Sequence, residues 1–378
     1  MKLGKLCILF TDGDWIESKD QSDSGIRLIQ TGNIGNGEFL YKNDKAKYIS
    51  VDTFKRLNCK EVFPNDILVS RLPEPVGRGC IIPDIGEKMI TAVDCTICRI
   101  NENLVDRKYF CYFLESNAYK TQLEQHVTGT TRKRISRKNL SSVEIDIPEQ
   151  AKQKEVVYKL DRLKKIIQNY NRELDLLDEL VRARFVEMFG DLRVNDKGWK
   201  YYKLDELTEL ITDGEHATPK RTTQGIYLLS ARNVLNHQLS LEDVDYIDYD
   251  EFSRISRRII PREGDVLISC SGSIGRCCVV PKNIKFQMVR SIALLRFKSN
   301  INPVFAEYMI TSDYLQDQIN KSKTASSQAN LFQGKIKSLK GVVPPLELQN
   351  QFASFVQEID KSRLLSNHSL FLIKSIIF

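Results

Sequence analysis

The longest regular pattern of apolar positions lies between residues 149 and 189. Apolar side chains recur there at alternating steps of four and three residues, which is the spacing of a coiled-coil seam. The seam consists of Val156, Leu160, Leu163, Ile167, Tyr170, Leu174, Leu177 and Val181, and is continued by Phe185 and Met188. Neither Pro nor Gly interrupts the segment. It predicts a helix roughly 60 Å long at 1.5 Å per residue.

A second amphipathic segment follows Pro344 and Pro345. Its apolar positions begin with Phe352, Val356 and Ile359 and then become less regular. A long isolated helix cannot cover its own apolar stripe, so we expect the two helices to pack antiparallel and bury both stripes.

Outside these helices, short apolar runs bounded by Pro and Gly predict strands. The clearest runs are 66–70, 79–82, 266–269 and 277–280. Asp106 and Asn302 each precede a helical stripe and are good N-cap residues. The pattern therefore predicts a mixed α/β (α+β) fold.

The chain also contains an internal duplication. Matching segments occur in the same order, at an offset that falls from 201 to 196 residues: 2–6 with 203–207, 25–29 with 225–229, 66–70 with 265–269, 76–78 with 274–276, and 105–112 with 301–308. Chance matches would be scattered, so the order indicates a repeated domain. We expect homologous domains at 1–147 and 192–343, a spacer helix at 148–191 and a C-terminal helix at 344–378, in a pseudo-two-fold arrangement.

The composition is that of a folded globular protein, with 42% hydrophobic and 28% charged residues. No apolar run approaches the roughly 18 residues of a membrane span, so we expect a cytoplasmic protein. The nine cysteines are scattered through apolar runs, as expected of reduced core thiols. A net charge of +7 is compatible with a polyanionic partner but does not demand one.

Each repeat contains one basic segment without acidic residues. In the first repeat it lies between Glu124 and Glu144, and in the second between Asp317 and Glu347. Basic side chains can bind phosphates, while Gln, Asn and Arg can pair with base edges. The candidate DNA-binding residues are Thr130, Thr131, Arg132, Lys133, Arg134 and Arg137 in the first segment, and Lys321, Lys323, Ser326, Ser327, Gln328 and Asn330 in the second. The alternative is a solvated basic face.

Two further pairs of loops occupy equivalent places. The loops after Asp12-Gly13 and Asp213-Gly214 supply the candidates Trp15, Lys19, His216, Lys220 and Arg221, and the turns after the strands at 66–70 and 266–269 supply Arg71 and Arg276. Each has an ordinary alternative. Trp15 could belong to the core, His216 could be a plain loop residue, and the arginines could serve structural turns.

Motifs that would indicate catalysis are absent from the sequence. Cys95 and Cys98 have metal-like spacing, but no second pair completes four ligands, so core thiols are favoured. Asn302-Pro303-Val304-Phe305 departs from the Asn-Pro-Pro-aromatic motif of adenine methyltransferases and is explained as a helix start. There is no phosphate-binding GxxxxGK[ST] loop and no nucleophile-base set. We therefore expect no catalytic residues, no metal and no cofactor in this chain.

The order of domain, long helix, domain and long helix resembles the specificity subunits of type I restriction-modification systems. The resemblance rests on the segments 63–70, 148–153, 185–191, 262–269 and 343–349, and covers essentially the whole chain. It implies that each domain reads one half of a bipartite site in double-stranded DNA. The helices, through the seam from Leu160 to Met188, would set the spacing and dock two modification subunits.

The resemblance also implies which chemistry belongs to partners. Adenine methylation with S-adenosylmethionine would reside in the modification subunits, and ATP- and Mg-dependent translocation and cleavage in the restriction subunits. The first repeat has Pro73 and Pro75 where the second has Ser271-Gly272-Ser273, so the two domains should read different sequences. The alternatives are an assembly scaffold that does not bind DNA, and an enzyme with unrecognised chemistry.

Overall fold

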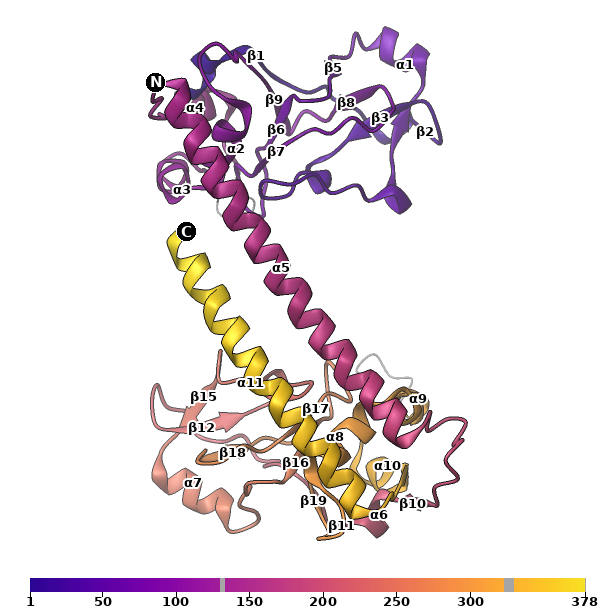
Figure 1. Ribbon diagram of the computed structural model, residues 1–378. Helices are drawn as coiled ribbons and strands as arrows, with labels where there is room; N and C mark the ends of the chain where they lie inside the picture. The colour runs from indigo at the N-terminus through magenta and orange to yellow at the C-terminus, as the bar shows by residue number, and fades with distance from the viewer. Residues whose placement is uncertain (130–132, 323–329, 378) are drawn as a thin grey trace. The chain divides into compact units, whose positions relative to one another are not determined.

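The computed structural model describes residues 1–129, 133–322 and 330–377. The chain divides into two compact units. The first unit comprises Met1–Asn169 with Ser369–Phe378, and the second comprises Tyr170–His368. Both units contain helices and strands (Figure 1). The predicted mixed α/β fold is thereby confirmed.

The first unit contains two sheets. The four-stranded antiparallel sheet has the order β1-β9-β6-β7, formed by Cys7–Asp12, Cys95–Ile100, Ile67–Ser70 and Gly79–Ile81. The second sheet has the order β2-β4-β3-β8-β5, formed by Gln21–Ser22, Tyr48–Ile49, Ile26–Ile29, Met89–Thr91 and Glu61–Val62. In this second sheet, β3 and β8 are parallel.

Alternation along the strands of the four-stranded sheet places apolar residues on both faces. Ile67 and Val69 belong to one buried cluster with Phe110 of α2, whereas Leu68 belongs to another with Ile29 of the second sheet. This is the two-residue period of a strand buried on both sides. The shorter α-helices of the unit are α1 (Val51–Arg56), α2 (Arg107–Glu115), α3 (Asn117–Glu124) and α4 (Arg137–Ser142).

The second unit repeats this arrangement. Its four-stranded sheet has the order β11-β19-β16-β17, formed by Thr208–Asp213, Ile292–Phe297, Val266–Ser269 and Cys277–Val279. Its three-stranded sheet has the order β15-β12-β18, formed by Asp245–Ile247, Ile226–Leu229 and Phe286–Met288. The smaller strands are β10 (Tyr201–Lys203), β13 (Val234–Leu235), β14 (Gln238–Leu239) and β20 (Lys340–Val342). The helices are α6 (Leu204–Leu207), α7 (Tyr249–Ser256), α8 (Pro303–Thr311), α9 (Asp313–Ser322) and α10 (Gln333–Ser338).

The duplication extends to individual polar contacts. Arg99 donates two hydrogen bonds to Asp66, each 2.8 Å long. Arg296 and Asp265 make the same bidentate pair in the second unit at 2.8 and 2.7 Å. Both carboxylates are nearly buried, and this fork geometry is the strong form of a charge-assisted hydrogen bond. The structure therefore confirms that the chain contains two copies of one fold.

The helix starts predicted from sequence are also confirmed. Asp106 accepts a hydrogen bond from the backbone N–H of Tyr109 at the start of α2. Asn302 caps α8 in the same way, with Pro303 in the first turn. Satisfying these otherwise unpaired N–H groups is the function of an N-cap, so Asn302-Pro303-Val304-Phe305 is a helix start.

Helix α5 (Gln150–Phe189) is continuous (Figure 1). Within the second unit its last turns run antiparallel to α11 (Leu346–Ile377), because contacts with higher-numbered residues of α11 involve lower-numbered residues of α5. These contacts are Phe352 with Phe189, Arg363 with Asp178, and Ser366 with Glu173. The predicted antiparallel packing is confirmed there.

All nine cysteines are free, and all except Cys7 are buried, as expected of core thiols. In the described part of the chain, no helix has the length and apolar character needed to cross a membrane. Among those same residues, no group of His, Cys, Asp and Glu side chains forms a metal site.

Candidate nucleic-acid interface

In the first unit, the carboxylate of Asp12 at the end of β1 organises the candidate surface. The hydroxyl of Thr96 donates a hydrogen bond to Asp12 at 2.9 Å. Arg71 forms an ion pair with Asp12 at 3.3 Å, and Arg137 lies 3.9 Å away. Asp12 therefore joins the ends of β1 and β9 to the turn after β6 and to the start of α4.

Arg71 has a structural position rather than the DNA-contacting one that the turn suggested. The residue is only 4% exposed. Besides the ion pair with Asp12, it donates a hydrogen bond to the carbonyl oxygen of Val93 at 2.6 Å. A guanidinium buried with these partners is not presented to a ligand, so the alternative of a structural turn applies to Arg71.

Main-chain hydrogen bonds join two described residues of the basic segment of the first unit. Thr128 and Arg134 exchange two main-chain hydrogen bonds, of 2.9 and 2.8 Å. Lys133, Arg134 and Arg137 are exposed, and Arg134 is held by an ion pair with Asp94 at 3.1 Å. The candidates Thr130, Thr131 and Arg132 lie outside the described residues.

Trp15 and Lys19 lie on the loop after β1. Trp15 is 71% exposed, so the alternative interpretation of a core tryptophan is wrong. Its ring N–H donates a hydrogen bond to Glu17 at 3.3 Å, and Lys19 forms an ion pair with the same carboxylate. An exposed indole is a large apolar surface available for contact with a partner.

The glycine that follows Asp12 or Asp213 is required for the same reason in both units. Gly13 packs so closely against β8 that a Cβ atom would lie 2.3 Å from the carbonyl oxygen of Thr91. Gly214 would meet the carbonyl oxygen of Met288 at 2.4 Å. Only glycine permits this approach, so the two loops leave the sheet edge at equivalent points.

In the second unit this loop carries His216, Lys220 and Arg221, all exposed. His216 lies 3.7 Å from Asp213, whose pKa is raised by burial. Arg221 forms an ion pair with Asp245 at 3.0 Å.

The interior beneath this loop differs between the units. Cys270 occupies the place of Arg71, and Asp213 that of Asp12, so Asp213 lacks the buried ion pair of the first unit. Arg258, which the sequence analysis did not select, instead donates to the carbonyl oxygen of Gly214 and to the hydroxyl of Thr212. No local sequence signal marks Arg258, because these partners are more than 40 residues away.

The remaining candidates of the second unit have varied positions. Arg276 is half-buried on the turn before β17, and Lys321 is exposed at the end of α9. Asn330 forms a backbone bridge with Ser271, which brings the basic segment to the turn after β16. The candidates Lys323, Ser326, Ser327 and Gln328 lie outside the described residues.

The predicted seam of α5 requires one correction. Leu160, Leu163, Ile167, Tyr170, Leu174 and Leu177 are half-buried, as the periodicity implies. Val181, Phe185 and Met188, however, pack into the core of the second unit around Phe305 and Phe352. These last three serve the unit's own core and are not available to a partner.

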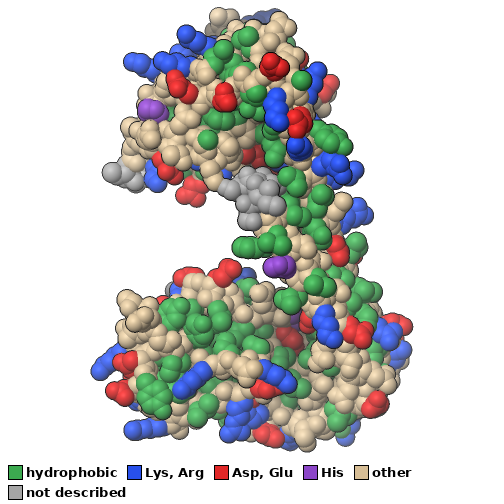
Figure 2. Space-filling model, turned by 60° about the vertical axis from the view of Figure 1, so that its left-hand side comes forward, with side chains coloured by type: hydrophobic (Ala, Val, Ile, Leu, Met, Phe, Trp, Pro, Cys, Tyr) green, Lys and Arg blue, Asp and Glu red, His purple; other side chains and the backbone are tan. Residues whose placement is uncertain are grey.

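Apolar side chains off the seam are more exposed, and the sequence analysis did not select them. They include Tyr158, Leu176, Leu180 and Val186 on α5, and Leu364, Leu365 and Phe371 on α11. Figure 2 shows, in addition, that Lys and Arg side chains are spread over the visible surface of each unit with Asp and Glu among them. The visible charge is not gathered into one basic patch.

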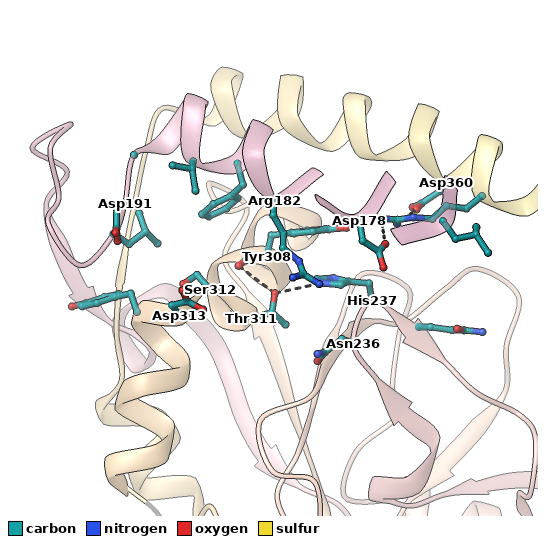
Figure 3. Close-up of a pocket in the computed structure, with 18 of the residues that line it drawn as sticks. Asp178, Arg182, Asp191, Asn236, His237, Tyr308, Thr311, Ser312, Asp313 and Asp360 are labelled. Carbon is teal, nitrogen blue, oxygen red and sulfur yellow. Dashed lines mark hydrogen bonds and ion pairs between the residues drawn. The ribbon is translucent and has the colours of Figure 1, made fainter. Parts of the chain in front are cut away.

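The second unit also contains a pocket of about 770 Å³ beside α5, α8 and α11 (Figure 3). His237, on the turn between β13 and β14, stacks on Tyr308 with ring centroids 4.0 Å apart. Its Nδ1 atom lies 3.4 Å from the carboxylate of the nearly buried Glu307. Burial raises the pKa of Glu307, an effect partly offset by His237. Both charge signs line the pocket, including Asp178, Arg182 and Arg193.

Comparison with known proteins identifies the repeated unit. The sequence model of the family described as "Type I restriction modification DNA specificity domain" matches residues 1–178 and again 196–373. The chain belongs to this family. The two matches correspond to the two copies seen in the structure, and the earlier resemblance is confirmed.

Relatives with curated descriptions agree. The type I restriction enzyme EcoKI specificity subunit of Escherichia coli (strain K12) is 20% identical over 359 residues, which cover 89% of this chain and 76% of that protein. The EcoBI specificity subunit of Escherichia coli is 22% identical over 293 residues, covering 70% of this chain and 61% of that protein.

Solved structures show the same fold. A chain from a structural study of complex assembly and conformational transition of the type I R-M system superposes with a TM-score of 0.61 at 14% identity, covering 100% of this chain and 94% of that chain. The S subunit of a type I restriction-modification system from M. genitalium gives a TM-score of 0.53 at 13% identity, covering 100% and 93%.

Proposed function

We propose that this chain is the DNA specificity subunit of a type I restriction-modification complex, in which each repeat reads one half of a bipartite target. The observation that carries the proposal is the specificity domain present twice, in two copies of one fold with equivalent loops at the same sheet edge. Those loops present Trp15, Arg134 and Arg137 in the first copy and His216 and Lys220 in the second. Family membership disfavours a scaffold that does not bind DNA.

The same proposal assigns the chemistry to other subunits. Two modification subunits would methylate adenine using S-adenosylmethionine, and restriction subunits would use ATP and Mg, while this chain would hold no cofactor and act in the cytoplasm. The recognition domains would comprise 1–147 and 192–343, and the helices 148–191 and 344–378.

We further infer that the modification subunits dock on the helices. The exposed apolar residues Leu176, Leu180, Leu364 and Leu365 offer the surface, and the pocket beside α8 adds polar groups at its edge. This arrangement replaces the seam residues Val181, Phe185 and Met188 as docking candidates, because their side chains are occupied within the core.

The proposal is tested by expressing the chain with type I modification subunits and sequencing the methylated genome. We expect one split motif, with two specified halves separated by unspecified bases. No methylation dependent on this chain, or one undivided motif, would contradict the proposal.

A matched pair of variants tests the surface. Arg134→Glu should weaken binding of the assembled complex to its target and lower the salt dependence of binding, because each lost phosphate contact removes about 0.9 from the slope of log K against log salt. Lys154→Glu, an equal change of charge at an exposed lysine of α5, is the control. Equal effects of the two variants would show that Arg134 has no special part in binding.

A further inference from the structure

The turn between β18 and β19 carries an exposed arginine, Arg290, on a tightly held backbone. The N–H of Arg290 donates to the carbonyl oxygen of Glu215 at 2.9 Å. The next residue, Ser291, accepts a hydrogen bond from the N–H of Cys270 at its carbonyl oxygen and one from the N–H of Ala231 at its hydroxyl oxygen. Three neighbouring segments thus fix the turn from which Arg290 projects.

These segments are also the ones that bring the candidate loops of the second unit together. His216 directly follows Glu215, and Ser271 follows Cys270. Ser271 forms the backbone bridge with Asn330 that joins the basic segment to this edge. Arg290 therefore lies on the turn where the segments of the proposed DNA surface meet.

Several exposed arginines of the second unit are neutralised by neighbouring carboxylates, whereas Arg290, like the exposed Arg262, is not among them. Arg221 and Arg232 share Asp245, and Arg254 pairs with Glu251. Within the described ranges, the structure gives no ion pair for Arg290. The Arg290 side chain is exposed and forms no ion pair with the described residues, and its backbone is held in place, so its guanidinium can bind an external partner.

The first unit has different residues at the equivalent position. Its equivalent turn carries Val93 and Asp94 in place of Arg290 and Ser291. Asp94 is acidic and holds Arg134 of the basic segment at 3.1 Å. The cation at this edge thus comes from the basic segment in the first unit and from the turn itself in the second.

We propose that Arg290 reads a guanine in the half-site recognised by the second unit. This inference rests on the function proposed above. The planar guanidinium can donate two hydrogen bonds to O6 and N7 of guanine in the major groove, a contact that discriminates against other bases. The fixed turn reduces the conformational freedom lost on binding, which strengthens such a contact.

The test compares Arg290→Ala, Arg290→Lys and Arg262→Ala in the complex with modification subunits. Arg262 is also exposed, but it precedes β16, at the opposite end of that strand from Cys270. Relative binding to a library of targets gives the base preference at every position. Arg290→Ala should lower the preference for one guanine in the second half-site by about 5- to 150-fold, with the first half-site unchanged.

The variants separate the possible outcomes. Arg290→Lys should keep most of the affinity but weaken the guanine preference, because the ammonium group lacks the planar fork that holds both hydrogen bonds in a fixed geometry. A uniform loss of affinity, with all base preferences kept and the salt slope reduced by about 1, would show a phosphate contact and overturn the inference. Unchanged preferences in Arg290→Ala would also overturn it, as would an equal effect of Arg262→Ala.

Failure of the proposed function would look different. In that case the wild-type complex would select no bipartite target, whereas failure of the Arg290 inference leaves the wild-type target intact. Far-ultraviolet circular dichroism and thermal melting of the three variants would establish that each is folded.

Discussion

Replacing Arg71 by methionine should destabilise the first unit by about 3 kcal/mol. The change removes the ion pair with Asp12 at 3.3 Å and the hydrogen bond to Val93 at 2.6 Å, while roughly retaining side-chain length. Breaking a buried ion pair costs about 3–5 kcal/mol because the remaining charge is stranded. The Asp12 side chain is 22% exposed, keeps its hydrogen bond from Thr96 and retains Arg137 at 3.9 Å, which places the expected value at the lower end of that range.

Hydrogen exchange measured by mass spectrometry on the intact chain is the suitable assay. The chain has two units, so a single unfolding transition need not report on the first unit alone. Peptides from β1 and β9 should exchange up to about 150-fold faster in Arg71→Met where exchange requires unfolding of the unit, since 1.4 kcal/mol corresponds to a factor of ten. Peptides from β11 and β19, which lie in the second unit, are the internal control.

The double variant Asp12→Asn, Arg71→Met decides the cause. Asparagine removes the stranded charge, so the double variant should be more stable than Arg71→Met alone. If both variants exchange equally fast, the loss arises from packing and the electrostatic explanation is refuted.

Three further predictions concern other parts of the molecule. Trp15→Ala should change the stability of the first unit by less than about 0.5 kcal/mol, because the ring is exposed, while reducing affinity for target DNA; a large loss in the melting temperature would contradict its surface position. Burial raises the pKa values of Cys95 and Cys270 to about 12, so iodoacetamide at pH 8 should modify them only after unfolding, and mass spectrometry showing rapid labelling of the native protein would refute this. Burial also raises the pKa of Glu307, so the folded second unit retains this proton more strongly than the unfolded chain and loses stability as pH rises from the ordinary carboxyl range through the raised pKa. Glutamine does not ionise, so the stability of Glu307→Gln relative to wild type should increase across the same pH interval. A difference in melting temperature between the two proteins that stays constant at all pH values would contradict this prediction.

The architecture could be predicted because its causes are repeated along the sequence. The seam from Val156 to Val181 indicates a helix at every turn, and two matching sets of segments reveal the duplication independently of any one motif. The N-caps Asp106 and Asn302 are local signals whose partners lie within three residues, so sequence spacing is sufficient to find them.

The surface was less predictable, because burial depends on residues distant in sequence. Arg71 and Trp15 both adjoin turns, yet Arg71 is buried and Trp15 is exposed. The burial of Arg71 depends on Asp12 and on Val93, contacts that no local pattern contains. Arg290 carries no motif either, and becomes a candidate only when the fold brings its turn beside Glu215 and Cys270.

The seam also shows why periodicity alone does not identify a docking surface. Phe185 has the spacing of the residues before it, but in the structure its ring packs against Phe305 and Phe352. An apolar stripe indicates that one face of a helix is buried. Whether that face packs against the same chain or against a partner depends on the tertiary fold.

The twin Asp66–Arg99 and Asp265–Arg296 pairs lie at one end of the central strands, and the unlike residues Arg71 and Cys270 follow the other end. The two copies therefore share the Asp–Arg pair at one end of the central strand and differ in the residues that follow its other end. The segments 70–78 and 269–276 should therefore be exchangeable between the two copies without disturbing the shared Asp–Arg pairs. Such an exchange would have to include Asp12 together with Arg71, and Asp213 together with Cys270. A duplicated fold of this kind can acquire a different binding specificity by exchange of these variable segments, while the Asp–Arg pairs and the strands that carry them stay the same.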